Sequence, residues 1–216
     1  IQINTETDFA AKNEVFLNFM DNIGQYSLNI EKLNVSIDDF NNIIFNKNLI
    51  ADMFKDVIAK IGENIVLSKL IIISNDENSL ISQYIHNSYR KNIGKIAVLL
   101  KSNVQTIDDE SKALGKNICM HIAASKPLAY NIEQLDKDLV EKERKIQKET
   151  IKGEGKPDNI IEKILEGKMK KYFSESTLLN QKYILDPDST IQQIIDEFSK
   201  KNKFDIIQYN LVVLGS

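Results

Sequence analysis

The chain has 216 residues, enough for one large domain or two small ones, and 42% of them are hydrophobic and 27% charged, as in ordinary soluble proteins. A net charge of −3 at pH 7 and a pI near 5.6 argue against a surface built for nucleic acid. The single cysteine excludes an internal disulfide and favours a reducing compartment, and no apolar run approaches the roughly 20 residues that cross a bilayer.

The first residues predict a strand followed by a helix. Ile1-Gln2-Ile3-Asn4 alternates apolar and polar residues, as at the end of a half-buried strand, and apolar residues recur at helical spacing from Val15 to Ile23. Residues 7–9 therefore lie on the turn between them, where Thr7 or Asp8 can accept hydrogen bonds from the first free N–H groups of the helix. Phe9 has two interpretations: a plug over its own core, or a side chain held out to enter another protein.

Residues 34–78 predict a helical region, a strand and a turn. Ser36 begins a helix, with Asp39 three residues on, and the helical spacing continues to Lys60. Gly62 ends this region, because a residue without Cβ most easily adopts the left-handed conformation. The β-branched run 65–73 predicts a strand, and residues 74–78 predict a polar turn.

The next segment predicts two strands and a long helix. Leu80–His86 and Ile93–Lys101 are predicted strands, joined by a connection at residues 87–94. Residues 108–124 predict a helix that ends before Pro127, because the residue preceding a proline disfavours the helical conformation. The C-terminal elements are predicted as a turn at 186–190, a helix at 191–198 and an alternating strand at 204–213.

Residues 133–173 are heavily charged, with sparse apolar residues at helical spacing. Two glycines and a proline within residues 152–157 interrupt this pattern, which therefore predicts an antiparallel helical hairpin, or coiled coil. The predicted apolar stripes are Leu135, Leu139 and Ile146 on the first arm, and Ile161, Leu165, Lys168 or Met169, and Tyr172 on the second.

Helix follows strand in both halves of the chain. We therefore expect an α+β fold of two related subdomains, residues 1–74 and 75–216, each an antiparallel sheet with packed helices, and with the hairpin inserted in the second. No catalytic or metal site is predicted, because no G-x-x-x-x-G-K-S/T loop is present and no second His, Cys or carboxylate stands at ligand spacing. Cys119 and His121 are two residues apart on a helix and so face different ways; His121 is interpreted as structural.

Several strings resemble signatures of elongation factor Ts, the guanine-nucleotide exchange factor of elongation factor Tu. Residues 7–13, TDFAAKN, resemble the family's T-D-F-V-A-(K/R)-N, and Ile61-Gly62-Glu63-Asn64 resembles its I-G-E-N. Tyr84-Ile85-His86 resembles Y-I-H-G, residues 121–127 resemble H-(I/V)-A-A-x-x-P, and residues 154–160 and 166–173 resemble the family's hairpin segments. These strings follow the family's order along the whole chain, which is more specific than any one of them.

The resemblance implies a protein that binds elongation factor Tu carrying GDP and releases the GDP without covalent chemistry. It implies that Thr7, Asp8, Phe9 and Ala10 dock on the partner's nucleotide domain, where Phe9 disturbs the Mg²⁺ and phosphate site. Ile61 and Gly62 would touch the same domain, and His86 would meet the partner elsewhere. GDP, GTP and Mg²⁺ would be bound by the partner, so no cofactor of the chain's own is implied, and the setting would be the cytoplasm of a bacterium, or an organelle.

The chain departs from the family pattern at Ala10, where Val is usual, and at Asn87, where Gly is usual. The chain opens on a strand with no Met and no signal-peptide pattern, so we expect that an upstream part is missing from it, namely the small N-terminal helical domain that the family carries. Two other classes of protein stay open. A coiled-coil adaptor would bind through residues 133–173 alone, and an enzyme would use Cys119 or His86.

Overall fold

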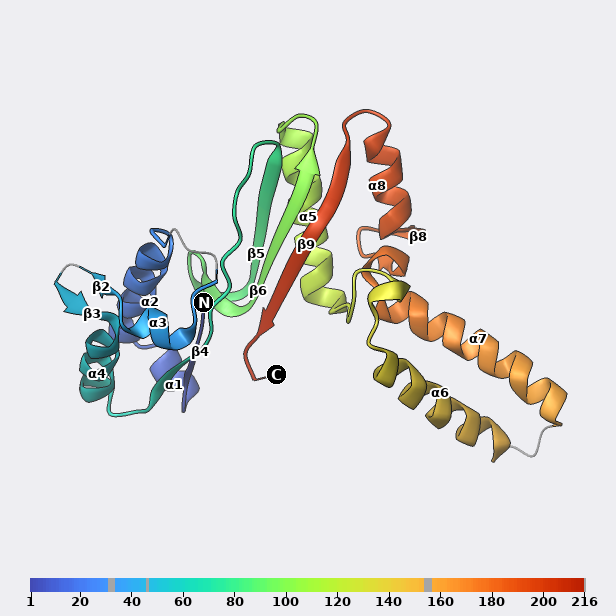
Figure 1. The fold of residues 1–216 in the computed structure, drawn as a ribbon, viewed down its shortest axis with the longest axis horizontal. Helices are drawn as coiled ribbons and strands as arrows, with labels where there is room; N and C mark the ends of the chain where they lie inside the picture. Colours follow the sequence, from blue (N-terminus) through green and yellow to red (C-terminus); the bar gives the residue numbers. More distant parts are fainter. Residues whose placement is uncertain (31–33, 46, 154–156, 216) are drawn as a thin grey trace.

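The computed structural model describes residues 1–30, 34–45, 47–153 and 157–215, and it has the expected mixed α+β class. The described strands form small antiparallel sheets, of which the largest has the order β5-β6-β9. Figure 1 shows N-terminal helices and short strands at one end, this sheet in the middle, and two long helices projecting at the other end. Each of these parts has its own cluster of buried apolar side chains.

The N-terminal part consists of short strands and the helices packed on them. Strand β1 pairs antiparallel with β4, so that Thr5 lies opposite Ile65. The buried side chains, which we term the N-terminal cluster, include the fully buried Ile23 and Phe40. The elements are β1 (Gln2–Thr5), α1 (Asp8–Ala11), α2 (Glu14–Ser27), α3 (Ile37–Asn41), β2 (Ile44–Phe45), β3 (Asn48–Leu49), α4 (Ile50–Ile61) and β4 (Ile65–Lys69).

The predicted helix start at Ser36 and helix end at Gly62 are confirmed, but Thr7 caps the short helix α1, and the helix predicted from Val15, α2, is capped by Asn13. The side chains of Thr7 and Ser36 accept hydrogen bonds from backbone N–H groups and cap α1 and α3, and Gly62 ends α4 in the left-handed conformation, with φ at 79°. The predicted strand over 65–73 is too long, because its partner β1 begins at Gln2 and the last pair is Gln2 with Lys69. The strand pair β2-β3, turned at Lys47 with φ at 71°, interrupts the predicted helical region.

The middle part is the three-stranded sheet, with α5 packed against it (Figure 1). Side chains of the sheet, α5 and α8 form the central cluster, in which Leu100, Ile118 and Phe204 are fully buried. The predicted C-terminal helix and strand are confirmed. The turn predicted at residues 186–190 is wrong, because these residues pair with residues 182–183 as a strand, although Thr190 caps the helix. The elements are β5 (Ser79–Arg90), β6 (Ile93–Val104), α5 (Asp109–Ser125), η1 (Ile132–Gln134), η2 (Leu178–Asn180), β7 (Lys182–Tyr183), β8 (Asp186–Thr190), α8 (Ile191–Ser199) and β9 (Phe204–Val213).

Strand β5 continues to Arg90, so the connection predicted at residues 87–94 is mostly strand, and the turn is only Lys91 and Asn92. Asn87 lies in the left-handed region with φ at 51°, a conformation that asparagine adopts more readily than most residues other than glycine. Asn87 therefore takes a backbone conformation that suits the Gly usual in the family pattern.

Helices α6 (Lys137–Lys152) and α7 (Asp158–Ser176) run away from the sheet and back, side by side (Figure 1). They bury a hairpin cluster of Ile151, Ile161, Leu165 and Met169. The predicted stripe on the first arm is wrong at Leu139 and Ile146, which are 46% and 47% exposed. Helix α6 has apolar residues on two faces, and α7 covers the face with Val140 and Ile151, three helical turns apart. Residues 154–156 of the predicted break lie outside the described residues.

The base of this hairpin is joined to the middle part by buried polar contacts. Nε2 of His121 lies 2.9 Å from Oε1 of Gln181, and Nε2 of Gln181 donates to the carbonyl oxygens of Glu175 at 2.7 Å and Ser125 at 3.4 Å. These carbonyls belong to the last turns of α7 and α5, so one side chain ties the two helix ends together. Burial lowers the pKa of His121, as expected for a structural histidine. None of the described helices is long and apolar enough to cross a membrane.

Candidate functional site

The turn at residues 7–10 presents an exposed aromatic side chain. Phe9 lies in α1, a helix of four residues, and 88% of its surface is exposed. Ala10 and Ala11 beside it are buried, so the alanine face holds the short helix against the protein while Phe9 lies outside. The interpretation of Phe9 as a plug over its own core is therefore wrong.

Thr7 caps this helix and is itself held by Glu63. Its Oγ1 accepts a hydrogen bond from the N–H of Ala10 at 3.2 Å and donates to Oε1 of Glu63 at 2.6 Å. Its backbone N–H donates to Oε2 of Glu63 at 3.0 Å. Glu63 directly follows Gly62, so the structure brings the two predicted contact stretches, residues 7–10 and 61–62, to one place.

Asp8 faces Lys95 of β6. The Nζ atom of Lys95 lies 3.0 and 3.1 Å from the two carboxylate oxygens of Asp8. The hydrogen bond and the charge of Lys95 lower the pKa of Asp8 below its ordinary value of 3.8, and Asp8 in turn raises the pKa of Lys95 above 10.5. This ion pair ties α1 to the three-stranded sheet.

Arg90, the last residue of β5, makes a second tie. Its guanidinium donates to Oδ1 of Asn18 at 2.8 Å, to the carboxylate of Asp21 at 2.7 Å, and to the carboxylate of Glu14. All three acceptors lie on α2, and the hydrogen bond to Asp21 is the largest cause of a raised pKa for Arg90. Helix α2, which follows the turn, is thus fixed to the end of β5.

Ile61 and Gly62 lie at the junction between α4 and β4. Ile61 is half-buried and packs against the N-terminal cluster, whereas Gly62 is exposed. Gly62 is therefore the more accessible of the two predicted contact residues, and Ile61 contributes to the core as well.

His86 lies apart from this turn, on the other face of the sheet. It pairs with Ile96 across β5 and β6, and both line a cavity of about 320 Å³ with Met120 of α5. Lys95, the neighbour of Ile96, points the opposite way, toward Asp8, because successive side chains of a strand alternate between faces. The structure therefore does not bring His86 together with residues 7–10.

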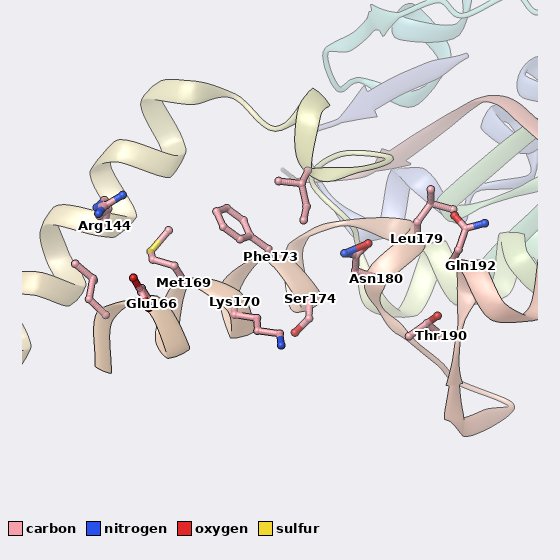
Figure 2. Close-up of a pocket in the computed structure, with 12 residues that line it drawn as sticks. Arg144, Glu166, Met169, Lys170, Phe173, Ser174, Leu179, Asn180, Thr190 and Gln192 are labelled. Carbon is pink, nitrogen blue, oxygen red and sulfur yellow. The ribbon is translucent and has the colours of Figure 1, made fainter. Parts of the chain in front are cut away.

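Larger cavities lie where the parts of the molecule meet. One of about 350 Å³ lies between the N-terminal part and the sheet, and Asp8, Tyr89 and Lys95 are among its lining residues. Another, of about 610 Å³, lies where the hairpin leaves the middle part, and Figure 2 shows Phe173 of α7 in its wall. This second lining combines apolar and charged side chains, among them Met169, Phe173, Leu179, Arg144, Glu166 and Lys170.

Of the two residues considered for catalysis, Cys119 and His86, the first is placed for a structural role. Cys119 is fully buried, and burial raises the pKa of its thiol to about 12, so the thiol stays protonated at neutral pH. His121 is also buried and bonds to Gln181. Among the described residues, no group of three or more His, Cys, Asp or Glu side chains is placed to hold a metal ion.

Sequence reasoning missed the residues that support the turn. Glu63 was part of a motif without a role of its own, and Lys95 and Arg90 carried no local signal. Asp8 and Lys95 are separated by 87 residues, and Glu14 and Arg90 by 76, so no pattern within a helix or strand predicts these pairs.

Comparison with known proteins covers nearly the whole chain. The profile of the family described as "Elongation factor TS" matches residues 6–216. The chain is 34% identical over 200 residues to elongation factor Ts of Sinorhizobium medicae (strain WSM419), and 36% identical over 202 residues to that of Bartonella henselae (strain ATCC 49882 / DSM 28221 / CCUG 30454 / Houston 1). Both alignments cover 93% of this chain but only 64% of the relative, so the chain spans about 64% of the length of these relatives. Because the profile matches residues 6–216, which is nearly the whole chain, the chain belongs to the elongation factor Ts family.

Proposed function

We propose that this chain is the core of a translation elongation factor Ts, which binds elongation factor Tu carrying GDP and promotes GDP release, so that GTP can bind. Family membership supports this partner and this activity. The observation that carries the proposal is Phe9, which is 88% exposed on a short helix held by Glu63 and Lys95. An exposed aromatic side chain on a backbone that is held in place is the kind of residue that anchors protein interfaces.

In the proposed mechanism, residues 7–10 dock on the nucleotide domain of the partner and Phe9 enters between its helices. This disturbs the partner's Mg²⁺ and phosphate site and weakens GDP binding without covalent chemistry. The factor and the nucleotide then oppose each other's binding by the same coupling free energy in both directions. The chain needs no cofactor, because GDP, GTP and Mg²⁺ are bound by the partner.

An acceleration of GDP release by more than about a hundredfold requires more than one contact with the partner. Burying one Phe side chain supplies about 1.5–3 kcal/mol, or roughly a tenfold to hundredfold change in an equilibrium. We therefore propose that Gly62 and the exposed part of Ile61 touch the same domain beside the turn. His86, on the opposite face of the sheet, is proposed to contact a second part of the partner.

We further propose that residues 1–74 and 75–216 are the two core subdomains, and that residues 133–173 form a coiled coil inserted in the second. The separate N-terminal, central and hairpin clusters support this division. The net charge of −3 supports a protein partner in place of nucleic acid, and the proposed place of action is the cytoplasm or an organelle.

Release of a fluorescent GDP analogue from elongation factor Tu tests this function. We expect the chain to accelerate release, and Phe9→Ala to lower the accelerated rate by tenfold or more. Leu28→Ala is the matched control, since Leu28 is 80% exposed but lies at the far end of α2. Without acceleration by the wild type the proposed function is wrong; with equal rates for Phe9→Ala, only the role of Phe9 is wrong.

A coiled-coil adaptor is the second candidate, and the exposed Leu139 and Ile146 on α6 favour it. An adaptor that binds through the hairpin would lose its partner when residues 133–173 are deleted. An exchange factor would keep its contacts in the N-terminal part and the sheet. Calorimetric titration of the deletion variant with elongation factor Tu separates the two.

A further inference from the structure

We propose that Glu63 is a positioning residue for Phe9: its carboxylate sets the orientation of the turn at residues 7–10 and thereby the maximal rate of nucleotide release. This proposal rests on the exchange function proposed above. It concerns a residue that acts from behind the turn, through Thr7.

Both carboxylate oxygens of Glu63 are used by a single residue. Oε2 accepts the backbone N–H of Thr7 at 3.0 Å, and Oε1 accepts its hydroxyl at 2.6 Å. Two bonds from different sides of Thr7 fix both the position and the rotation of this residue. One bond alone would leave Thr7 free to turn about it.

The hydroxyl bond also determines how Thr7 caps α1. A threonine hydroxyl has one proton to donate and lone pairs that accept. Because the proton goes to Glu63, a lone pair of Oγ1 is left to accept the N–H of Ala10 at 3.2 Å. The bonds therefore run in one direction, from Ala10 through Thr7 to the carboxylate.

Phe9 lies inside the short loop that the bond between Thr7 and Ala10 closes. The carbonyl oxygen of Thr7 accepts two further bonds, from the N–H of Ala11 at 3.2 Å and from Oγ1 of Thr5 at 3.0 Å. The Phe9 side chain is 88% exposed, so little packing holds it in place. Its direction is therefore set by the backbone that Thr7 and Glu63 fix.

The position of Glu63 follows from the pairing of β1 with β4. Thr5 pairs with Ile65 and Asn4 with Val66, and the same antiparallel register, extended by two residues, places Thr7 opposite Glu63. The left-handed Gly62 at the end of α4 then leads the chain into this register. The contact is thus imposed by the sheet and the helix end.

The chemistry of the contact requires two acceptors on the side chain. In this contact the N–H and the hydroxyl of Thr7 both act as donors, and a carboxylate accepts on both oxygens. A Gln side chain offers one acceptor and one donor, so it can keep the bond to the N–H of Thr7 but not the bond from the hydroxyl. We therefore expect Glu63→Gln to retain part of the function and Glu63→Ala to lose most of it.

The test measures nucleotide release from elongation factor Tu at increasing concentrations of the chain, which gives a maximal rate and a half-saturating concentration. We expect Glu63→Ala to lower the maximal rate about tenfold and to change the half-saturating concentration less than about threefold. Glu63→Gln should lie between this variant and the wild type. Glu77→Ala is the charge-matched control, because Glu77 is exposed and precedes the start of β5, whereas the turn lies near the end of β5.

The double variant Phe9→Ala/Glu63→Ala shows whether Glu63 acts through Phe9. If it does, the second substitution slows release no further than Phe9→Ala alone. Two results would overturn the proposal. In one, Glu63→Ala slows release in the Phe9→Ala background as much as it does in the wild type. In the other, Glu63→Ala alone keeps the maximal rate of the wild type.

Amide hydrogen exchange on the isolated chain tests the positioning role of Glu63 without depending on nucleotide release from elongation factor Tu. Glu63→Ala should speed exchange at the N–H of Ala10, and Glu77→Ala should not. Protection of Ala10 that is unchanged in Glu63→Ala overturns the positioning role. If wild type fails to accelerate nucleotide release, the exchange function is wrong, and the hydrogen-exchange result still decides whether Glu63 orders the turn.

Discussion

The turn at residues 7–10 and the α6–α7 hairpin both project from the buried clusters, but they are held in different ways. Helix α1 has four residues, too few for a core of its own, and is fixed by Glu63 and Lys95 from neighbouring elements. The hairpin helices have 16 and 19 residues and bury a cluster between themselves. A short projection depends on its neighbours for rigidity, whereas a long one supplies its own. The two should therefore fail through different substitutions.

The largest expected effect is on the hairpin. Leu165 is 1% exposed in the hairpin cluster, and Leu165→Ala should lower the stability of the hairpin by about 2–5 kcal/mol, because it leaves a cavity between the helices. Ile160→Ala, which removes a side chain that is 44% exposed on the same helix, is the control. Urea unfolding followed by circular dichroism measures the loss. A parallel fall in the rate of nucleotide release would show that the two projections are not independent.

The base of the hairpin should weaken in acid. Burial lowers the pKa of His121 below its ordinary value of 6.5, so the unfolded chain binds a proton more readily than the folded one. The stability that the buried, neutral His121 contributes is fully present above pH 6.5. It falls as the pH drops from 6.5 toward the pKa of His121 in the folded state. Urea unfolding at pH 7.5 and 5.5 measures this, and His121→Gln should reduce the difference between the two stabilities.

The turn should respond to the loss of Lys95 through Asp8. Lys95→Met should raise the pKa of Asp8 toward its ordinary value of 3.8, because it removes the hydrogen bond and the charge that hold this pKa down. The contribution of this ion pair is present above pH 3.8 and is lost as the pH falls through the lowered pKa. NMR titration of the Asp8 carboxyl carbon measures the shift. An unchanged titration would mean that Lys95 does not support the turn in solution.

The smallest expected effect is at Asn87, whose backbone leads β5 toward the tie between Arg90 and α2. Asn87→Gly should change stability by less than about 0.5 kcal/mol, since glycine suits the left-handed conformation but has more freedom in the unfolded chain. Asn87→Ala should cost about 1 kcal/mol, because Cβ is crowded at positive φ. Thermal unfolding of both variants measures the difference. Equal stability of the Ala and Gly variants would contradict the left-handed backbone.

Local chemistry made part of the fold predictable. The cap at Ser36 and the helix end at Gly62 depend on residues within four positions, so local sequence decides them. The length of β5 was not predictable, because Asn87 interrupts the strand pattern and only the pairing with β6 carries the strand past it. The buried stripe of α6 was predicted on the wrong face for a similar reason. Helix α6 has apolar residues on two faces, and the packing of α7 determines which face is buried.

The candidate site was predictable only as a segment. Family resemblance, and not periodicity, singled out Phe9, since an aromatic residue on a turn can equally cover its own core. Its exposure follows from the burial of Ala10 and Ala11 and from contacts with Glu63 and Lys95, which lie 56 and 87 residues away from their partners in the sequence. Such distances are set by the whole fold.

The hydrogen bonds at Gln181 have a mechanical consequence for the hairpin. Helix α7 has 19 residues and is therefore about 28 Å long, whereas each bond at its base acts over about 3 Å. A sideways force at the tip acts through a long lever arm and reaches the base multiplied several-fold. Because the base bonds are short-ranged and the hairpin has its own core, the hairpin should swing as a stiff arm once they break. While the bonds at Gln181 hold, a force on the hairpin is transmitted to the last turn of α5, and through α5 to the sheet that carries His86.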